Sequence, residues 1–455
     1  MTNYKLSYSQ TDLDLTQTLN KPKKWYYVAV ILLGLGVAWG GGSWLHQILT
    51  GVGVSGKNNP VGWYLYITTF VFWVGIAHSG TLISAILFLF RVKWRAPVYR
   101  SAEAVTVFGL ATAGLFPLLH MGRVWVFYWT LPYPQMGGLF PNFRSPLVWD
   151  VFAITTYLTV SSIFFLTGMV PDVAIIRDKA KGWRKKLYGF LAQGWQGTDN
   201  QWRHYTAAYV FLAALATPLV ISVHSIVSWD FAMSIVPGWH STIFAPYFVA
   251  GAIHSGLAMV ILILIPMRNA FNLHQYITDH HLESLAKFLL FTATVVGFAY
   301  LIELFIAWYS HNPWEQAIFL YRAFGDYWFA FWALFVCNLV IPQLFWFKRF
   351  RRSIPFLVFV SIAVTIGMWF ERFTIIVTSL AHEYIPFAWG LPSLTWSETG
   401  IVVGSFCWFF FLFLIFAKTL PVVSMWEVKE QLDPPMSGSK RATGQGGRGA
   451  GESAG

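Results

Sequence analysis

Cysteine and charge are both scarce in this sequence. Only two of its 455 residues are cysteines, and 11% are charged against 56% hydrophobic. Two thiols cannot supply the four ligands of an iron–sulfur cluster, so any such cluster must belong to another chain. A soluble globular domain carries about 25% charged residues, so the composition excludes an ordinary soluble domain.

A secretory signal is also missing from the start of the sequence. The first 24 residues are polar and include Asp12 and Asp14. A signal peptide would instead have a basic start followed at once by an apolar core. We therefore expect residues 1–24 to be a cytoplasmic N-terminal segment.

Long apolar runs are what the sequence has in abundance. A helix of about 20 apolar residues crosses the roughly 30 Å hydrocarbon core of a bilayer. The sequence predicts an all-α integral membrane protein with ten transmembrane helices. These cover residues 25–48, 61–90, 101–130, 147–170, 204–235, 241–267, 282–309, 326–347, 355–384 and 398–425.

The basic residues indicate the orientation of these helices. With the N-terminus in the cytoplasm, most Lys and Arg fall in inner segments, and the outer loops hold only Lys57, Arg144 and Arg322. The positive-inside rule then puts both termini in the cytoplasm. The net charge of +11 thus indicates topology and not a nucleic-acid partner. We expect the Gly- and Ser-rich tail, residues 431–455, to be disordered.

A short motif occurs twice. GIAHSG at 75–80 and GAIHSG at 251–256 place His78 and His254 176 positions apart. Similar offsets relate other polar residues: His46 with His224, Glu103 with Glu283, His120 with Glu303, and Asp150 with Asp326. Four helices intervene, an even number, so the repeat is parallel. The predicted architecture is two four-helix bundles, residues 61–235 and 236–384, with peripheral helices in residues 25–60 and 385–430.

The repeated His-Ser-Gly allows two interpretations. Small Ser and Gly residues let helices approach closely, with each His bonding to a neighbour. Alternatively, ionisable groups at membrane depth are costly and usually face a cavity, an ion route or a ligand. Their recurrence at equivalent positions of two bundles favours a polar lining.

The outer ends of the third and fourth helices have the densest set of polar and aromatic residues. His120 lies on the third helix with Arg123 one turn further on, and Asp150 lies in the first turn of the fourth. A helix N-terminus favours a carboxylate, and Pro146 suits a helix start. A quinol needs acceptors for the protons of its two hydroxyls, and a His–Asp pair among aromatics would supply them. Arg123 and Arg372 are further candidates for binding the quinol. The alternative is a structural ion pair of Asp150 with Arg123 or Arg144.

Further ionisable residues lie within the apolar runs. Arg372 needs a counter-charge if buried. Its neighbour Glu371 is expected to point elsewhere on the helix, so Asp150 is a candidate partner and a structural clamp is the alternative. A proton path is a hypothesis for a set of residues that spans inner to outer depths: His78, Glu103, His254, Glu283, Glu303 and Asp326.

Three stretches carry a family resemblance. They are NNPVGWYLYITTFVFWVGIAHSGTLISAILFLFR, RSAEAVTVFGLATAGLFPLLHMGRVWVFYW and FRSPLVWDVFAITTYL. Together they closely resemble the NrfD-like, polysulfide-reductase-type membrane subunits, and within that family the sequence is most similar to the ActC subunits of alternative complex III. The resemblance covers roughly residues 25–425.

The resemblance implies quinol oxidation near the periplasmic face of a bacterial inner membrane, with menaquinol as the expected quinol. It implies His120 and Asp150 as catalytic quinol-site residues, with Arg372 as the family's buried Arg, and no haem or metal on this chain. The implied partners are an iron–sulfur subunit, a second NrfD-like subunit, and multihaem and monohaem c-type cytochromes. Proton translocation coupled to this electron transfer is a further hypothesis.

Two other functional classes fit the sequence less well. A di-haem cytochrome b needs paired axial histidines on two helices, and only His240 and His254 have a suitable spacing of 14. A secondary transporter would also have internal repeats with polar residues at the midplane. However, no helix shows a Gly- or Pro-broken centre matched in both halves, and the polar cluster lies at one end.

Overall fold

Helices make up all the regular secondary structure in the part of the chain that the computed structural model describes, residues 7–131 and 145–432. Within these described residues, ten spans are long and apolar enough to cross a membrane, which confirms the predicted all-helical membrane fold. Those built from a single helix are α2 (Lys24–Thr50), α7 (Pro146–Lys179), α9 (Asp199–Ala232), α10 (Phe244–Ala270), α11 (Asp279–Tyr309) and α18 (Trp396–Thr419).

The other spans are composite. They are α3, η2 and α4 (Leu65–Thr81, Leu82–Ile86, Leu87–Leu89); α5 and α6 (Tyr99–Ala113, Leu115–Met121); α13, η5, α14 and η6 (Trp328–Phe335, Val336–Val340, Ile341–Gln343, Leu344–Trp346); and α16, η7 and α17 (Ile354–Phe373, Thr374–Thr378, Ser379–Ala381). The segments η2, η5 and η7 are single π-helical stretches. Such stretches are rare and often occur at functional sites.

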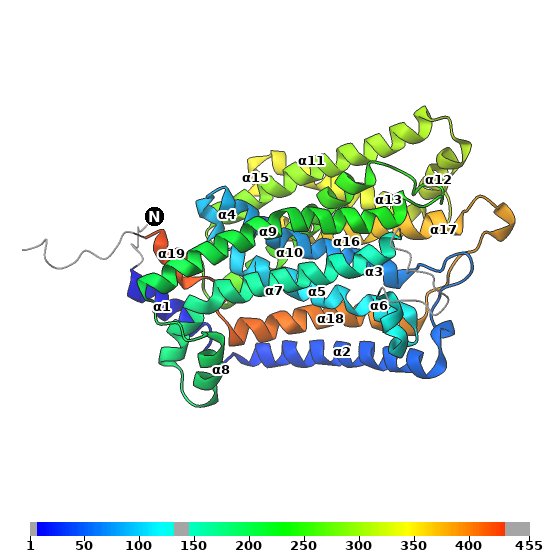
Figure 1. The fold of residues 1–455 in the computed structure, drawn as a ribbon. Coiled ribbons are helices and arrows are strands. Elements are labelled where there is room, and N and C mark those ends of the chain that lie inside the picture. Colours follow the sequence, from blue (N-terminus) through cyan, green and yellow to red (C-terminus); the bar gives the residue numbers. More distant parts are fainter. Residues whose placement is uncertain (1–6, 132–144, 433–455) are drawn as a thin grey trace, which may run out of the picture.

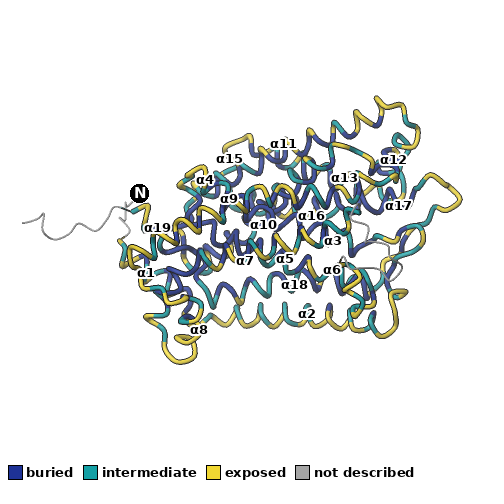
Figure 2. Tube along the Cα trace, in the orientation of Figure 1, coloured by how far each residue is buried: buried dark blue, intermediate teal, exposed yellow. Residues whose placement is uncertain are grey.

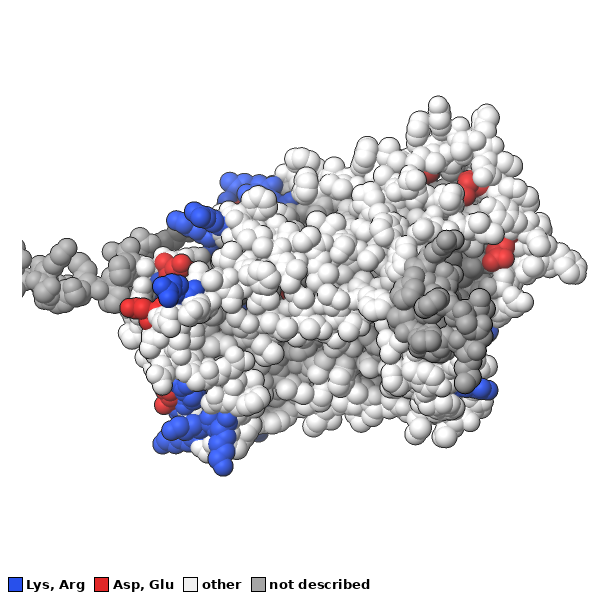
Figure 3. All heavy atoms as spheres, in the orientation of Figure 1, with Lys and Arg blue, Asp and Glu red and all other residues white. Residues whose placement is uncertain are grey.

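Short helices lie at the two ends of the spans. They are α1 (Tyr8–Gln17), η1 (Val52–Val54), η3 (Lys93–Arg95), η4 (Val124–Thr130), α8 (Trp183–Leu191), α12 (Pro313–Phe324), α15 (Lys348–Arg351), η8 (Pro386–Ala388) and α19 (Met425–Glu430). Figure 1 shows α1, α8 and α19 at one end and α6, α12 and α17 at the other. Figure 3 shows most visible Lys and Arg atoms at the first of these, which we name the basic end.

The spans α3 and α10 form the centre of the molecule. In their most apolar windows, 89% and 78% of the residues are buried, against 11% for α2. Figure 2 shows the same contrast, with an exposed α2 along one edge. The helices α2 and α18 pack against each other along much of their length, so they form a layer beside the other spans.

The two His-Ser-Gly motifs meet where α3 crosses α10. A Cβ on Gly256 would lie 2.4 Å from Ser79 Oγ, and one on Gly75 would lie 3.4 Å from Ser255 Oγ. The small residues therefore permit the close approach of the two central helices, as the packing interpretation predicts. The histidines themselves bond elsewhere: His78 Nδ1 lies 2.8 Å from Val74 O, and His254 Nδ1 lies 2.9 Å from Thr292 Oγ1.

Two predicted helix boundaries were wrong by nine residues. The third span ends at Met121 and not at 130, because Gly122 adopts a left-handed φ of +74° and the 3₁₀ helix η4 follows. Arg123 is therefore exposed beyond the span and does not share a helical face with His120. The fourth span continues to Lys179 and not to 170.

Buried charge explains why α7 continues so far. Asp172 is fully buried and forms an ion pair of 3.0 Å with Arg100. Its other oxygen accepts hydrogen bonds of 3.1 Å from the Met425 and Trp426 N–H groups at the start of α19. Arg95 and Glu427, 2.9 Å apart, add a second buried pair. These tertiary contacts dock α19 onto the basic end, and a hydropathy pattern cannot predict them.

Candidate functional site

Two carboxyl groups face each other at the end of the molecule opposite the basic end. Asp150 lies in the second turn of α7, whose start is set by Pro146, and Asp230 lies two residues before the end of α9. The two side chains are within hydrogen-bonding reach of each other. Asp150 is buried, and one oxygen of each carboxyl has no hydrogen-bond partner among the described residues.

This pair has no described positive partner. Among residues 7–131 and 145–432, no Lys or Arg forms an ion pair with Asp150 or Asp230. The predicted alternative partner Arg144 lies outside the described residues, and Arg123 is exposed. Two carboxylates this close repel each other unless they share a proton or hold a cation. The pair is therefore suited to accepting and releasing protons.

The sequence interpretation missed Asp230, although a signal for it exists. Both aspartates follow a tryptophan, in LVWD at 147–150 and VSWD at 227–230. The rings of Trp149 and Trp229 meet edge to face, with centroids 6.0 Å apart. Because α7 and α9 are antiparallel neighbours, their two Trp-Asp dipeptides come together at the same end. The recurrence of this dipeptide near the ends of adjacent spans would have identified the pair.

His120 lies in the last turn of α6 at the same end of the spans. It is half-buried, and its Nδ1 is enclosed without a hydrogen-bond partner among the described residues. No hydrogen bond or ion pair between described atoms joins it to Asp150. The structure thus places both predicted residues at the end opposite the basic end but does not join them directly.

A polar network supports the backbone around His120. Gln47 of α2 donates to Leu119 O at 2.7 Å and accepts from the Tyr66 hydroxyl at 2.5 Å. Lys57 Nζ donates to His120 O at 3.4 Å. Burial lowers the pKa of Lys57, and the carboxylate of Glu398 opposes this effect. This network holds the end of α6 in place while leaving the His120 ring nitrogen free to accept or donate a proton.

Arg372 has a different partner from the predicted one. Its Nη1 lies 3.2 Å from Glu371 Oε1, and its guanidinium stacks 4.2 Å above the Phe248 ring. The expectation that Glu371 points elsewhere was wrong, because a long Arg side chain can fold back to an adjacent residue. Gly251 leaves the necessary space on α10, since a Cβ there would lie 3.0 Å from Arg372 Nη2.

The Arg372–Glu371 pair belongs to a network in the second half of the chain. Tyr300 donates its hydroxyl proton to Glu371, and Asn338 Nδ2 donates to the Tyr300 oxygen at 2.9 Å. Asn338 lies in the π-helical stretch η5, which turns it into the interior. Arg372 is therefore neutralised by Glu371 and not by Asp150.

Two histidines meet edge to face in the interior between α3 and α9. The rings of His78 and His224 are fully buried with centroids 4.5 Å apart, and neither nitrogen of His224 has a described partner. Tyr157 adds a further polar group, since its hydroxyl shares a 2.6 Å hydrogen bond with Thr81. His78 also lines a groove of about 460 Å³ between α3, α9 and α10. His46, aligned with His224 in the repeat, lies instead beside Trp396, at the edge of the molecule.

The other residues of the hypothetical proton path are widely separated. Glu103 is buried near the basic end, where the Tyr209 hydroxyl donates to it at 3.5 Å. Glu283 pairs with Arg351 and Arg352 at 3.2 and 2.8 Å, and Glu303 pairs with Arg322 at 3.1 Å. The side chain of Asp326 is 57% exposed.

Metal ligands do not cluster in the described parts of the chain. No group of three or more His, Cys, Asp or Glu side chains in these residues could hold a metal ion. The absence of a resident metal or haem remains a prediction, since it came from the resemblance. The described carboxyl and imidazole groups can accept and release protons.

Comparisons with known proteins agree with the membrane fold. The family model described as polysulphide reductase, NrfD, matches residues 53–382. The putative membrane C subunit of a dimethyl sulfoxide reductase from Halobacterium salinarum is 30% identical over 53% of this chain, and the chain spans only 51% of that relative.

Two further relatives match over more of their length. The C subunit of selenate reductase from Mesobacillus selenatarsenatis is 21% identical over 85% of this chain and 91% of its own. An Hdr-like menaquinol oxidoreductase integral membrane subunit of Archaeoglobus fulgidus is 23% identical over 83% of this chain and 85% of its own.

Proposed function

Since this chain belongs to the NrfD polysulphide reductase family, we propose that it is the quinol-binding membrane subunit of an oxidoreductase complex. The observation that carries the proposal is the Asp150–Asp230 carboxyl pair, which lies at one end of the spans without a described positive partner. The name of the Archaeoglobus relative supports menaquinol as the quinol.

In the proposed reaction, this chain accepts the protons of the quinol and its partner subunits accept the electrons. Oxidation of one quinol to quinone releases two protons and two electrons. The aspartate pair accepts one proton and His120 Nδ1 accepts the other, because both groups are enclosed and have free acceptor positions. A positioned acid or base contributes about 10²–10⁴-fold to such a step. The electrons pass to an iron–sulfur subunit, because the two cysteines of this chain cannot supply the four ligands of an iron–sulfur cluster.

The finer proposals follow from the resemblance and the charge distribution. We place the basic end in the cytoplasm under the positive-inside rule, which puts the Asp150–Asp230 pair at the periplasmic face of a bacterial inner membrane. Similarity to ActC supports c-type cytochromes and a second NrfD-like subunit as partners. The two proposed bundles, residues 61–235 and 236–384, are related by the sequence repeat and meet at the crossing of α3 and α10.

We also propose that the electron transfer is coupled to proton translocation. Buried groups along the first half of the chain offer a route from the aspartate pair through His224, His78 and Tyr157 toward Glu103. His254 lies at a similar depth in the second half. The ion pairs of Glu283 and Glu303 and the exposure of Asp326 favour structural roles for those three.

Quinol-driven turnover of the purified native complex tests the proposed function. We expect Asp150→Asn and His120→Ala to lower the rate by about 100-fold or more with all subunits retained. Asp326→Asn is the matched control, since Asp326 is the repeat-related aspartate and is exposed. If the Asp150→Asn complex assembles and turns over at the wild-type rate, the quinol site lies elsewhere.

A further inference from the structure

A cavity lies at the basic end, far from the Asp150–Asp230 pair. Its volume is about 840 Å³, and it is enclosed by α1, the linker that follows, and the ends of α2, α10 and α18. This exceeds the groove beside His78, of about 460 Å³. The quinol chemistry proposed above does not use the larger cavity, so its lining needs a separate explanation.

The rim of this cavity is positively charged. Lys21, Lys23 and Lys418 line it together with one acid, Asp14, which leaves a net charge of three minus one, or +2. Asp14 is already occupied, because it accepts from the Tyr276 hydroxyl at 3.0 Å and from Gln10 Nε2 at 2.7 Å. None of the three lysines forms an ion pair with a residue in the described ranges.

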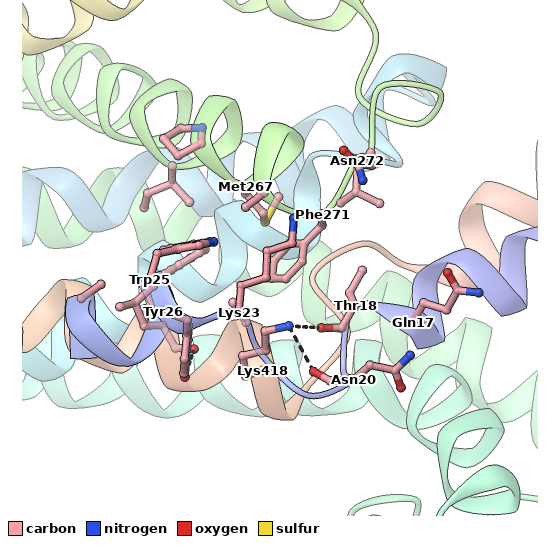
Figure 4. A pocket seen from close by; sticks show the side chains of 18 of the residues that line it. Gln17, Thr18, Asn20, Lys23, Trp25, Tyr26, Met267, Phe271, Asn272 and Lys418 are labelled. Carbon is pink, nitrogen blue, oxygen red and sulfur yellow. Dashed lines mark hydrogen bonds between the residues drawn. The ribbon is translucent and has the colours of Figure 1, made fainter. Parts of the chain in front are cut away.

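Lys418 is held in place although it has no anionic partner. Its Nζ donates to Thr18 O at 2.7 Å and to Asn20 O at 3.3 Å, as the dashed lines in Figure 4 show. The same ammonium lies 4.7 Å from the centre of the Phe271 ring. These contacts shape the linker between α1 and α2, so that Lys21 and Lys23 border the same cavity.

The walls of the cavity are apolar and lead into the membrane. On each of α2, α10 and α18 the lining extends over nine residue positions, or eight steps along the helix, from Trp25 to Leu33, from Ala270 to Leu262, and from Lys418 to Phe410. At 1.5 Å per residue, these walls are about 12 Å deep. Leu32 on one wall is 62% exposed, so the cavity opens toward the surrounding lipid.

We propose that this cavity binds one anionic phospholipid of the surrounding membrane. Its phosphate would lie among Lys21, Lys23 and Lys418, and its acyl chains along the apolar walls. Basic pockets between membrane helices on the cytoplasmic side recognise anionic headgroups, with about 1 kcal/mol per Lys or Arg. Trp25 and Tyr26 suit the interface between headgroups and chains. A quinone would leave the three cations without a counter-charge.

The site stands apart from the quinol proposal. Its ligand makes no contact with the Asp150–Asp230 pair, and its test measures lipid binding and not turnover. Loss of lipid selectivity would overturn the lipid site alone, and normal turnover of Asp150→Asn would overturn the quinol site alone.

Native mass spectrometry of the delipidated full-length chain tests the site directly. We expect phosphatidylglycerol to bind more tightly than phosphatidylcholine with the same acyl chains. The double variant Lys21→Gln/Lys23→Gln should weaken phosphatidylglycerol binding about 30-fold, from about 1 kcal/mol per lysine. The control Lys185→Gln/Lys186→Gln removes two exposed charges from α8 at the same end and should leave binding unchanged.

A second variant and two competitors separate the lipid from other ligands. Leu33→Trp fills an apolar wall and should weaken binding of both lipids. Equal affinity for the two lipids, or unchanged affinity of the double lysine variant, would overturn the proposal. Displacement of phosphatidylglycerol by millimolar inorganic phosphate would show a simple anion site, and displacement by a short-chain quinol would show a quinone site; either result also overturns it.

Discussion

The two halves of the chain treat buried acids near the same end of the molecule in opposite ways. In the first half, Asp150 and Asp230 face each other without a described cation. In the second half, Glu303 lies 3.1 Å from Arg322. Arg322 also donates to Gly238 O at 3.3 Å and to Ser379 Oγ at 3.1 Å. The second acid is neutralised and held by a rigid network, whereas the first two can exchange a proton.

Repeat-related positions in the two halves do not have the same surroundings. The sequence alignment pairs Asp150 with Asp326 and His120 with Glu303. In the structure Asp150 is buried, while the Asp326 side chain is 57% exposed and lies 3.9 Å from His382. Similar residues at equivalent positions have therefore taken different surroundings. We infer a functional role for the buried acids whose charge has no described partner, and a structural role for the buried acid that is paired with a cation.

Removal of one partner of the compensated pair should have the largest effect on stability. Arg322→Met leaves Glu303 buried without its partner, which costs about 3–5 kcal/mol. The double variant Arg322→Met/Glu303→Leu should recover most of this loss, because no lone charge remains. Unfolding of the purified chain in mixed micelles with increasing SDS measures both. Asp150→Asn in the same assay should be neutral or stabilising; a loss as large as that of Arg322→Met would erase the contrast.

The crossing that joins the halves gives the next largest effect. Gly256→Ala would place a Cβ 2.7 Å from the backbone oxygen of Ile76. The resulting overpacking should lower the free energy of unfolding by about 1–3 kcal/mol. Gly42→Ala is the control, because a Cβ there meets no atom within 4 Å. If the two variants unfold at the same SDS concentration, close packing at the His-Ser-Gly motifs is not needed.

Removal of the second carboxyl should have the smallest effect and should show whether the aspartates act as a pair. With Asp230→Asn, Asp150 can still accept a proton, so we expect turnover to fall only about tenfold, or 1.4 kcal/mol. The pH–rate profile should also show one ionisation fewer. Two interacting carboxyl groups give two apparent pKa values that belong to the pair, whereas a single carboxyl gives one. Turnover measured across pH in wild type, Asp230→Asn and the control Asp326→Asn checks this. An unchanged profile for Asp230→Asn would mean that Asp150 works alone.

The class of the protein and the number of its spans could be predicted from the amino-acid sequence alone, and so could the importance of the two His-Ser-Gly motifs. Apolar runs of sufficient length must become membrane helices, because backbone groups in hydrocarbon have to bond within their own segment. Small residues in GIAHSG and GAIHSG offered close packing as one of two interpretations, although their recurrence had favoured a polar lining, and the structure shows the close approach. Both inferences depend on neighbours in the chain, which is why they could be made without coordinates.

The pairing of buried charges could not be predicted from the sequence, because it depends on how the helices pack. Asp230 joins Asp150 across two helices, Glu371 and not Asp150 neutralises Arg372, and three separated segments form the cavity that Lys418 borders. The early end of the third span, which excluded Arg123, was decided by the left-handed φ of Gly122. A buried charge takes whichever partner the packed helices bring within a few ångströms, and that distance is a property of the whole fold and not of any local pattern.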